Sequence, residues 1–384
     1  MGQINRQEFL EKGFVIVRNL IRPDRLGILR DRFEDLVRHE WPDGVPDGSY
    51  QPRIYGYSKH VDASTADTME FMHHESTMGL SRKLMGVEDV GLAYHFLMCN
   101  PVRDHGPWFW HRDFTPVTEG PLEGPQTDFL ANGPVLVQWN VALYDDDVLE
   151  VVPGSHVRPN TGEENAQLGV VPHSYAKQQP EQGEPRHTSL PGSVLTDLKA
   201  GDGVAYVNML LHRGSRYGPK PRRCIHFGHR AFGGRRFFHE GLSRTVLAAE
   251  HLSPEARGAA ERCVRLYDEE RGHVEGVYRA ILDKDEAGFQ NHLAELHPGD
   301  KNRFVCLVHL CKIAQRLKPG GAYDLPLAED EIEQLWRRFS PLDEALKADE
   351  DQYMPGFQVT GPTPYRFYDL PKDFGIEQFV RSWR

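Results

Sequence analysis

The segment Trp108-Phe109-Trp110-His111-Arg112-Asp113-Phe114 places a histidine and a carboxylate two residues apart among aromatic side chains. In an extended strand, residues two apart point to the same face, so His111 and Asp113 project together and Arg112 faces away. An imidazole and a carboxylate on one face provide two of the three ligands of the two-histidine, one-carboxylate site that binds non-haem Fe(II). Such a short motif also arises by chance in a chain with 19 histidines.

His212 is the candidate for the third ligand, at the end of a strand predicted from Val204 to Leu210. Antiparallel strands bring distant segments of a chain into register, so this separation suits a β-barrel. Arg223 follows eleven residues later on the next predicted strand, where we expect it to face the same cavity. A guanidinium binds a carboxylate through two parallel hydrogen bonds, which suits the far end of a dicarboxylate ligand.

Residues 135–144 show the clearest strand alternation in the chain. One face is wholly apolar, whereas the other carries Gln138 and Asn140 at its centre. Two amides on the inner face of a barrel would orient a ligand. An edge strand with one solvated face fits the same pattern equally well.

Short strands joined by turns predict a mostly β core, an all-β barrel or jelly roll, preceded by helices at 6–12 and from Pro23. Residues 41–64 are predicted to form a long loop, and residues 157–190 a polar excursion from the core. The character of the sequence changes after residue 245.

Ser253 followed by Pro254 is a good helix start, and the helical pattern runs to about residue 282, with Gly272 and Gly276 as candidate breaks. Further helices are expected at 284–296, 301–318 and 328–347. We therefore predict a core domain with flanking N-terminal helices over 1–245, and a C-terminal helical extension over 246–384 whose tail packs on that core.

The bulk properties exclude several classes of protein. A net charge of -11 argues against a general nucleic-acid binder, and no apolar run is long enough to span a membrane. The N-terminus lacks the apolar core of a signal segment. The five cysteines include no CxxC pair, which suits buried free thiols in a reducing compartment. We predict a cytoplasmic protein without nucleic-acid or membrane partners, and the sequence does not indicate its oligomeric state.

Taken in order, these segments resemble the phytanoyl-CoA dioxygenase family of Fe(II)- and 2-oxoglutarate-dependent oxygenases. The likeness begins at Glu8-Phe9-Leu10-Glu11-Lys12-Gly13-Phe14-Val15-Ile16-Val17 and includes the pair His111 and Asp113. It continues through Val151-Val152-Pro153-Gly154-Ser155-His156, which is similar to the PGSH turn of that family, and ends with His212 and Arg223. The resemblance covers roughly residues 5–235.

This resemblance implies a double-stranded β-helix, which is a flattened, cupin-like jelly-roll barrel. It implies that His111, Asp113 and His212 are the catalytic iron ligands and that Arg223 holds 2-oxoglutarate, while His156 has a structural role. The family usually has a serine two residues after the distal histidine and an asparagine at the fifth position. Here those positions hold Gly214 and Tyr217, and Ser215 is displaced by one. Ser215, Gln138 and Asn140 complete the candidates for cofactor binding.

The implied cofactors are Fe(II), 2-oxoglutarate and O2, and the implied reaction hydroxylates an aliphatic C–H bond of a small molecule with release of succinate and CO2. Halogenases of this fold replace the carboxylate with a small residue, so Asp113 favours hydroxylation over halogenation. Two alternatives stay open, a catalytically inactive barrel that serves as a binding or scaffold protein, and a cupin-like metal isomerase or hydrolase without a co-substrate.

The sequence does not identify the substrate. Residues 212–244 hold nine Lys and Arg against one acid, Glu240, which allows an anionic substrate near the barrel mouth. We expect most of these cations to pair with acidic residues, for example those of the C-terminal helices. His226 and His229 face opposite sides of their strand, and His229, on the face of Arg223, is expected to be a core histidine.

Overall fold

The computed structural model describes residues 4–47, 51–104, 106–114, 120–168, 188–232, 250–297, 299, 302–317, 325–353 and 370–383. These residues form two compact units. The first contains the described residues of 4–113, 136–230 and 250–264, and the second contains those of 114–135, 231–232 and 265–383. Segment 120–135, which the predicted 1–245 domain includes, therefore groups with the C-terminal helices.

The first unit combines strands with short helices. In chain order its elements are α1 (Arg6–Lys12), β1 (Phe14–Val17), α2 (Pro23–Glu40), β2 (Arg53–Tyr55), η1 (Tyr57–His60), α3 (Asp67–His73), η2 (Glu75–Gly79), α4 (Leu80–Met85), β3 (Val90–Cys99), β4 (Leu136–Ala142), β5 (Leu149–Val151), η3 (Ser155–Val157), α7 (Gly162–Leu168), β6 (Val194–Leu195), β7 (Gly203–Tyr206), β8 (His212–Gly214) and β9 (Arg223–Ala231).

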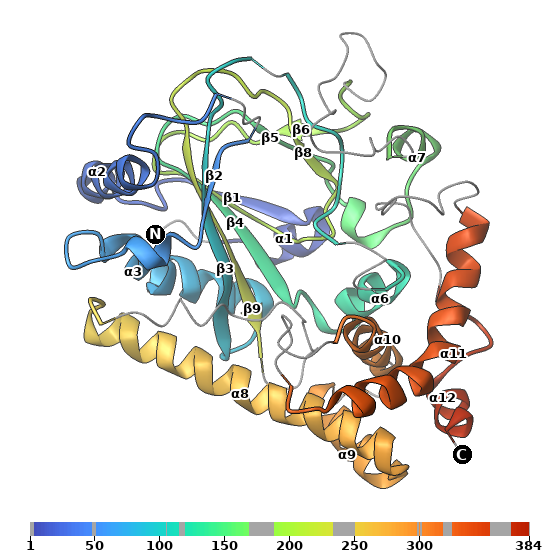
Figure 1. Ribbon diagram of the computed structural model, residues 1–384. Coiled ribbons are helices and arrows are strands. Elements are labelled where there is room, and N and C mark those ends of the chain that lie inside the picture. The colour runs from blue at the N-terminus through green and yellow to red at the C-terminus, as the bar shows by residue number, and fades with distance from the viewer. Residues whose placement is uncertain are drawn as a thin grey trace. The chain divides into compact units, whose positions relative to one another are not determined.

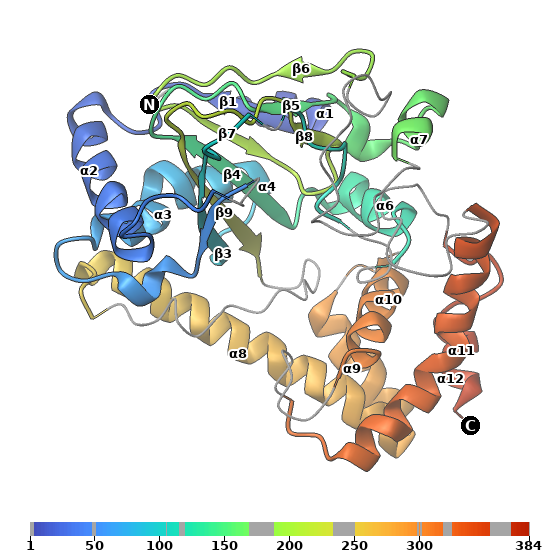
Figure 2. The same ribbon diagram turned by 45° about the horizontal axis from the view of Figure 1, so that its top comes forward.

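The strands form two sheets. The larger has the order β1-β7-β4-β9-β3-β2, and β4, β9 and β3 are seen side by side in Figure 1. The smaller has the order β6-β5-β8, and Figure 2 shows its strands together. β4 pairs antiparallel with β7 and with β9, and β5 pairs antiparallel with β6 and with β8. The expected β core is thus present as antiparallel sheets, with substantial helices around them.

The two faces of β4 have different partners. We call the face of Gln138 and Asn140 the inner face and the face of Trp139 the outer face. On the outer face Trp139 lies opposite Phe227 of β9, and the indole N–H of Trp139 donates to Ser81 of α4 at 2.9 Å. On the inner face Gln138 lies opposite Gly228, and Asn140 lies opposite His226. The predicted alternation is therefore correct. The edge-strand alternative is wrong, because β4 lies between two strands and its residues are all buried.

Two local predictions are wrong. The loop expected over 41–64 contains β2, which pairs with β3 at the edge of the larger sheet, and the short helix η1. The strand expected over 204–210 ends at Tyr206, and His212 begins β8 instead of ending that strand. Between them, the backbone turns away because the N–H of Val207 donates to the carbonyl of Gly13 at 3.0 Å and that of Leu211 donates to Oγ of Ser155 at 2.8 Å.

The PGSH-like turn holds the N-terminal helix. Gly13 ends α1 with a φ of 81°, a left-handed conformation that favours glycine, and a Cβ there would lie 2.5 Å from Nδ1 of His156. Nε2 of His156 donates to the carbonyl of Leu10 at 3.0 Å. His156 is fully buried and belongs to the scaffold, as expected.

The second unit is helical. It holds α6 (Glu123–Asn132), α9 (Glu286–Leu296), α10 (Arg303–Ala314), α11 (Glu329–Tyr353) and α12 (Ile376–Ser382), and Figure 2 shows the last four gathered together. Helix α8 (Pro254–Asp283) starts in the first unit and ends in the second without a break at Gly272 or Gly276. The apolar residues of α10 from Val305 onward are buried, and Lys312 forms a buried 3.3 Å ion pair with Asp343 of α11.

All five cysteines are buried and free, as predicted. Of the helices within the described residues, none combines the length and the apolar character that crossing a bilayer requires.

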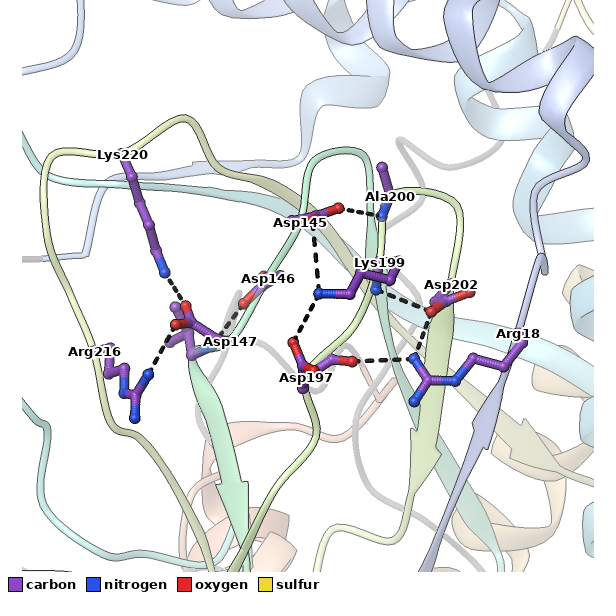
Figure 3. Close-up of polar contacts among 11 residues, drawn as sticks. Arg18, Asp145, Asp146, Asp147, Asp197, Lys199, Ala200, Asp202, Arg216 and Lys220 are labelled. Carbon is purple, nitrogen blue, oxygen red and sulfur yellow. Dashed lines mark hydrogen bonds and ion pairs between the residues drawn. The ribbon is translucent and has the colours of Figure 1, made fainter.

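The turns that follow β4 and precede β7 are joined by a network of charges, which Figure 3 shows. Its most buried member at the β1 side is Asp202, with 3% of its surface exposed. One carboxylate oxygen accepts from the backbone N–H of Asn19 at 2.8 Å. The other accepts from the guanidinium of Arg18 at 2.6 Å and from the backbone N–H of Lys199 at 2.9 Å. Asp202 therefore links the end of β1 to the turn that leads into β7.

We predict that Asp202→Asn lowers the free energy of unfolding by about 2–3 kcal/mol, because an amide presents a donor where the carboxylate accepts from a backbone N–H and from Arg18. Asp145→Asn is the control, since the Asp145 side chain is 68% exposed and its substitution should change stability by less than about 1 kcal/mol. Urea denaturation followed by circular dichroism measures both. Equal effects of the two substitutions would show that Asp202 is not a link of this kind.

Candidate metal centre

His111, Asp113 and His212 meet in the first unit. Each offers one ligand atom, and these atoms all lie within 4.8 Å of one another. Nε2 of His111 is 3.6 Å from one carboxylate oxygen of Asp113, and Nε2 of His212 is 3.3 Å from the other. The structure brings together the three residues that the sequence analysis selected as metal ligands.

Backbone pairing places the two histidines side by side. The N–H of His111 donates to the carbonyl of His212, and the N–H of His212 donates to the carbonyl of His111, both at 2.9 Å. The N–H of Asp113 donates to the carbonyl of Asn208 at 2.8 Å. Residues directly opposite in an antiparallel pair point to the same face, so the two imidazoles project together.

Hydrogen bonds set the orientation of both imidazoles. Nδ1 of His111 donates to the carbonyl of Phe109 at 3.1 Å, and Nδ1 of His212 donates to the carbonyl of Leu210 at 2.8 Å. A proton on Nδ1 leaves the lone pair of Nε2 available to a metal ion. Burial, helped by the nearby His212, lowers the pKa of His111 to about 4, so its imidazole is neutral and able to bind a metal at neutral pH.

The carboxylate of Asp113 is oriented by Gln138, whose side-chain N–H donates to it at 2.8 Å. Burial alone would raise the pKa of Asp113, but His212, His111 and this hydrogen bond outweigh burial and hold the pKa well below its ordinary value. The carboxylate therefore stays charged. The amide oxygen of Gln138 is buried and accepts no hydrogen bond from the described residues.

These observations fit a ferrous ion. Two neutral imidazole nitrogens and one charged carboxylate, all on one side, are the ligand set that binds non-haem Fe(II) and leaves coordination positions open. A buried amide oxygen without a donor is costly in a closed protein interior, and it is common where a ligand or water supplies the missing hydrogen bond. The site thus has both the ligands for the metal and an acceptor beside it.

Arg112, between the two ligands, points away from the metal site as predicted and is 1% exposed. Its guanidinium donates to the carbonyl of Ser155 at 3.0 Å, to Asn160 at 2.5 Å and to the carbonyl of Met209. It therefore ties the segment of His111 to the PGSH-like turn and to the segment before His212. The sequence analysis found the direction of this side chain but not its contacts.

The neighbours of the two histidines form a second support. Arg213 follows His212, lies 4.7 Å above the ring of Trp110, and donates to Glu150 at 2.8 Å. Arg213 and Glu150 are both buried, with side-chain exposures of 3% and 7%. Sequence reasoning missed this support, although strand alternation directs a residue adjacent to each ligand to the opposite face.

The inner face of the larger sheet continues from the metal site. Tyr206 lies opposite Gln138, and its ring is 5.2 Å from that of His212. Nδ1 of His226 donates to Asn140 at 2.6 Å, and burial lowers the pKa of His226 to about 3. Asn140 thus orients His226, and within the described part of the chain its side chain makes no hydrogen bond to a metal ligand.

His229 lies on the outer face, where Nε2 donates to the carbonyl of Met72 at 2.9 Å and Nδ1 accepts from Ser81 at 2.8 Å. It is a core histidine, as expected.

The structure places Arg223 away from the metal site. It shares the outer face of β9 with Ile225 and Phe227, and its guanidinium forms a 3.0 Å ion pair with Glu34 of α2. The expectation that Arg223 faces the cavity is therefore not met. Alternation along β9 directs Arg222 to the inner face, with Cys224 and His226.

Arg222 is 3% exposed, and its Nε donates to Asp146 at 2.7 Å. The sequence analysis missed Arg222 because the eleven-residue spacing from His212 does not determine which residues of the following strand point to the inner face.

The positions after His212 explain the departure from the family pattern. A Cβ at residue 214 would collide with the ring of Tyr217, so the buried tyrosine requires a glycine there. The hydroxyl of Ser215 donates to the carbonyl of Val148 at 3.0 Å. Ser215 is thus bonded to the residue that precedes β5. The ring of Tyr217 lies 5.8 Å from the guanidinium carbon of Arg222, and its hydroxyl accepts from Gln51.

Most described cations of the basic segment pair with acids of the first unit. Arg213 pairs with Glu150, Arg216 and Lys220 both pair with Asp147, and Arg222 pairs with Asp146. Pairing was expected, although with the C-terminal helices as the example. Residues 235, 236, 239, 240 and 244 lie outside the described residues.

Comparisons with known proteins identify a family. The model of the family described as "Phytanoyl-CoA dioxygenase (PhyH)" matches residues 9–224, which is more than half of the chain. The comparison of the sequence with curated proteins finds no match.

The solved structures to which the chain is similar include the non-haem alpha-ketoglutarate-dependent epimerase SnoN from nogalamycin biosynthesis. It is 16% identical with a TM-score of 0.40, and the similarity covers 59% of this chain and 80% of that chain. EctD from S. alaskensis is 16% identical with a TM-score of 0.42, over 62% of this chain and 80% of that chain. AviO1 from Streptomyces viridochromogenes Tue57 is 19% identical with a TM-score of 0.40, over 60% of this chain and 96% of that chain.

The matched region spans the whole His-Asp-His site. The predicted cofactors, Fe(II), 2-oxoglutarate and O2, are therefore confirmed as those of an oxygenase of this general kind. The chain belongs to the phytanoyl-CoA dioxygenase family.

Proposed function

We propose that this protein is an Fe(II)- and 2-oxoglutarate-dependent dioxygenase that hydroxylates an aliphatic C–H bond of a small molecule, and that its two sheets form a double-stranded β-helix. The observation that carries the proposal is the convergence of His111, Asp113 and His212, with both imidazoles presenting Nε2 to the carboxylate. When bound there, ferrous iron with 2-oxoglutarate and O2 supplies the oxidising power, with succinate and CO2 as the co-products.

The chain's own residues prepare this chemistry. The carbonyls of Phe109 and Leu210 accept the Nδ1 protons, and so keep both Nε2 lone pairs directed at the metal position. Gln138 fixes the plane of the Asp113 carboxylate. Such hydrogen bonds hold ligands in a defined orientation before the metal arrives, and this preorganisation favours a single coordination geometry.

We assign the binding of the far carboxylate of 2-oxoglutarate to Arg222 in place of Arg223. Arg222 lies on the inner face, and Asp146 holds it through Nε alone, so the two terminal nitrogens of the guanidinium make no hydrogen bond to the described residues. These terminal nitrogens are the pair that binds a carboxylate in a bidentate manner. The ring of Tyr217 packs beside the guanidinium and limits the space around it.

Aromatic and aliphatic side chains limit the entry of water to the inner face. Tyr206 is 2% exposed and Met98 is 8% exposed, while Phe109, next to the metal site, is 8% exposed. A dry site protects the oxidising chemistry from side reactions and lets the substrate take the place of water. The side chain of Asp113 is 36% exposed, so a small molecule can reach the metal position from the solvent.

Replacement of Asp113 by alanine should abolish the iron-dependent formation of succinate, with a loss of about 100-fold or more, because the site loses its only charged ligand. Wild-type enzyme treated with a chelator should behave the same way and recover when Fe(II) is restored. Asp104→Ala is a matched control, since that carboxylate is exposed and, among the residues the structure describes, bonds only to the backbone N–H of Gly106. Succinate is measured by mass spectrometry.

The substrate itself can be sought with the same readout. Protein is incubated without oxygen with Fe(II), 2-oxoglutarate and a panel of metabolites, and is then exposed to air. A metabolite that gains one oxygen atom together with succinate supports the proposal. A wild-type protein that forms no succinate under any condition would support a scaffold, and turnover without 2-oxoglutarate would support a metal isomerase or hydrolase.

Two adjacent arginines provide a sharper test. Arg222→Gln should raise the KM for 2-oxoglutarate by about 10- to 100-fold, because a bidentate charged contact is lost. Arg223→Gln should leave that KM within about twofold, since Arg223 pairs with Glu34 on the outer face. Initial rates of succinate formation at varied 2-oxoglutarate give both values. The reverse ranking of the two variants would return the role to Arg223.

A further inference from the structure

A second arginine, Arg53, reaches the inner face from the edge strand β2. Arg53 lies opposite Met98 of β3, and Tyr55 lies opposite Phe96. Opposed residues of an antiparallel pair point to the same side, and the ring of Phe96 lies 4.5 Å from that of His226, which faces the interior. The guanidinium of Arg53 itself lies 5.1 Å from the centre of the Phe96 ring.

Arg53 has no acidic partner within the described residues. Its terminal nitrogens donate to the side-chain oxygens of Tyr55, at 3.3 Å, and of Gln51. Its Nε is buried and makes no hydrogen bond. Arg222 and Arg213, by contrast, are each paired with a buried carboxylate.

A guanidinium that is largely removed from water and has no counter-ion is unfavourable, unless an anion occupies the space beside it.

A series of ring contacts connects Arg53 to the metal site. Its guanidinium lies 5.1 Å from the ring of Phe96, and Phe96 lies 4.5 Å from His226. The ring of Tyr206 lies 6.4 Å from that of His226 and 5.2 Å from that of His212.

Burial alone would lower the pKa of Arg53, but Tyr217, Tyr55 and Asp113 together raise it. Asp113 is a metal ligand, so its charge is shared with the metal and does not serve as a dedicated partner of Arg53. An anion bound by Arg53 would therefore lie near the metal position.

The surroundings of Arg53 are aromatic. The ring of Tyr55 lies 5.0 Å from that of Phe96, the ring of Tyr94 lies 6.3 Å from that of Phe96, and Tyr94 stacks at 5.5 Å on His226. Tyr55 is 61% exposed, whereas His226 is 5% exposed. A continuous series of rings thus runs from the solvent at β2 to the buried inner face. We call this series, Tyr55, Phe96, Tyr94 and His226, the aromatic wall.

We propose that Arg53 and the aromatic wall form the binding site of the primary substrate, and that this substrate is an organic acid whose carboxylate binds Arg53 while its apolar or ring-shaped body lies on the wall. The inference rests on the proposed oxygenase function. It assigns one arginine to each anion, Arg222 to 2-oxoglutarate and Arg53 to the substrate. A planar guanidinium presents two parallel donors to a carboxylate, and flat rings favour an apolar body over a hydrated one.

Binding measurements with the co-substrate site filled test this assignment. Wild-type protein is held without oxygen with Fe(II) and saturating 2-oxoglutarate, and is titrated calorimetrically with benzoate and 3-phenylpropanoate. The corresponding neutral amides, benzamide and 3-phenylpropanamide, are titrated in parallel, together with inorganic phosphate. Wild type should bind the carboxylates about tenfold or more tightly than the amides. Wild type should also bind benzoate and 3-phenylpropanoate more tightly than inorganic phosphate, because phosphate has no apolar group that could pack on the aromatic wall.

Arg53→Gln should remove the preference for carboxylate over amide and leave the affinity for 2-oxoglutarate within about twofold. That unchanged affinity also shows that the variant is folded. Arg53→Lys keeps the positive charge but lacks the two parallel donors of a guanidinium, so it should retain a weakened preference for carboxylate over amide. This variant provides the test if Arg53→Gln does not fold. Arg103→Gln is the control, because Arg103 is exposed and pairs with the exposed Asp47.

The outcomes separate the two proposals. Wild-type protein that binds 2-oxoglutarate with Fe(II) but shows no preference for carboxylates would overturn the role of Arg53 and leave the oxygenase function intact. A large loss of 2-oxoglutarate affinity in Arg53→Gln would also overturn it, by placing Arg53 at the co-substrate. A wild-type protein without iron-dependent binding of 2-oxoglutarate would overturn the function, and the inference with it.

Discussion

The reciprocal backbone hydrogen bonds between His111 and His212 are the constraint on which the site depends. They are the contact that sets two residues far apart in the chain directly opposite each other, both at 2.9 Å. A shift of one residue in this register would turn one imidazole to the opposite face and leave no metal site. The pairing is only an isolated bridge beside β8, so it needs support from the side chains around it.

That support comes from the face opposite the metal ligands. Arg112 joins the first ligand segment to the PGSH-like turn, and Arg213 packs on Trp110 and pairs with Glu150. A buried guanidinium is tolerated where carbonyls or a carboxylate accept its protons, and these partners also fix where the segment lies. The residues between the metal ligands are therefore as constrained as the ligands, although they serve the fold and not the chemistry.

Much of this could be predicted from the sequence. Strand alternation in 135–144 correctly separated Gln138 and Asn140 from the apolar face, and the two-residue spacing of His111 and Asp113 correctly placed them together. Both are local properties, decided by residues within the same strand. The convergence with His212 needed the ordered family pattern in addition, because no local rule connects segments so far apart.

What could not be predicted depended on loop lengths and on tertiary contacts. The phase of β9 is set by the Pro-containing loop before it, so Arg223 was chosen where Arg222 faces inward. β2 is three residues long and becomes a strand by pairing with β3, which concealed Arg53 within an apparent loop. The grouping of α6 with the C-terminal helices likewise depends on tertiary packing, which the sequence pattern does not indicate.

The close approach of Tyr217 to Gly214 has an evolutionary consequence. A serine at position 214 would collide with the phenol ring, whereas removal of the ring alone would leave a void beside Arg222. Substitutions at positions 214 and 217 are therefore tolerated only when both occur together, which is epistasis within one loop. Related proteins that carry the glycine are therefore expected to carry a large ring three residues later.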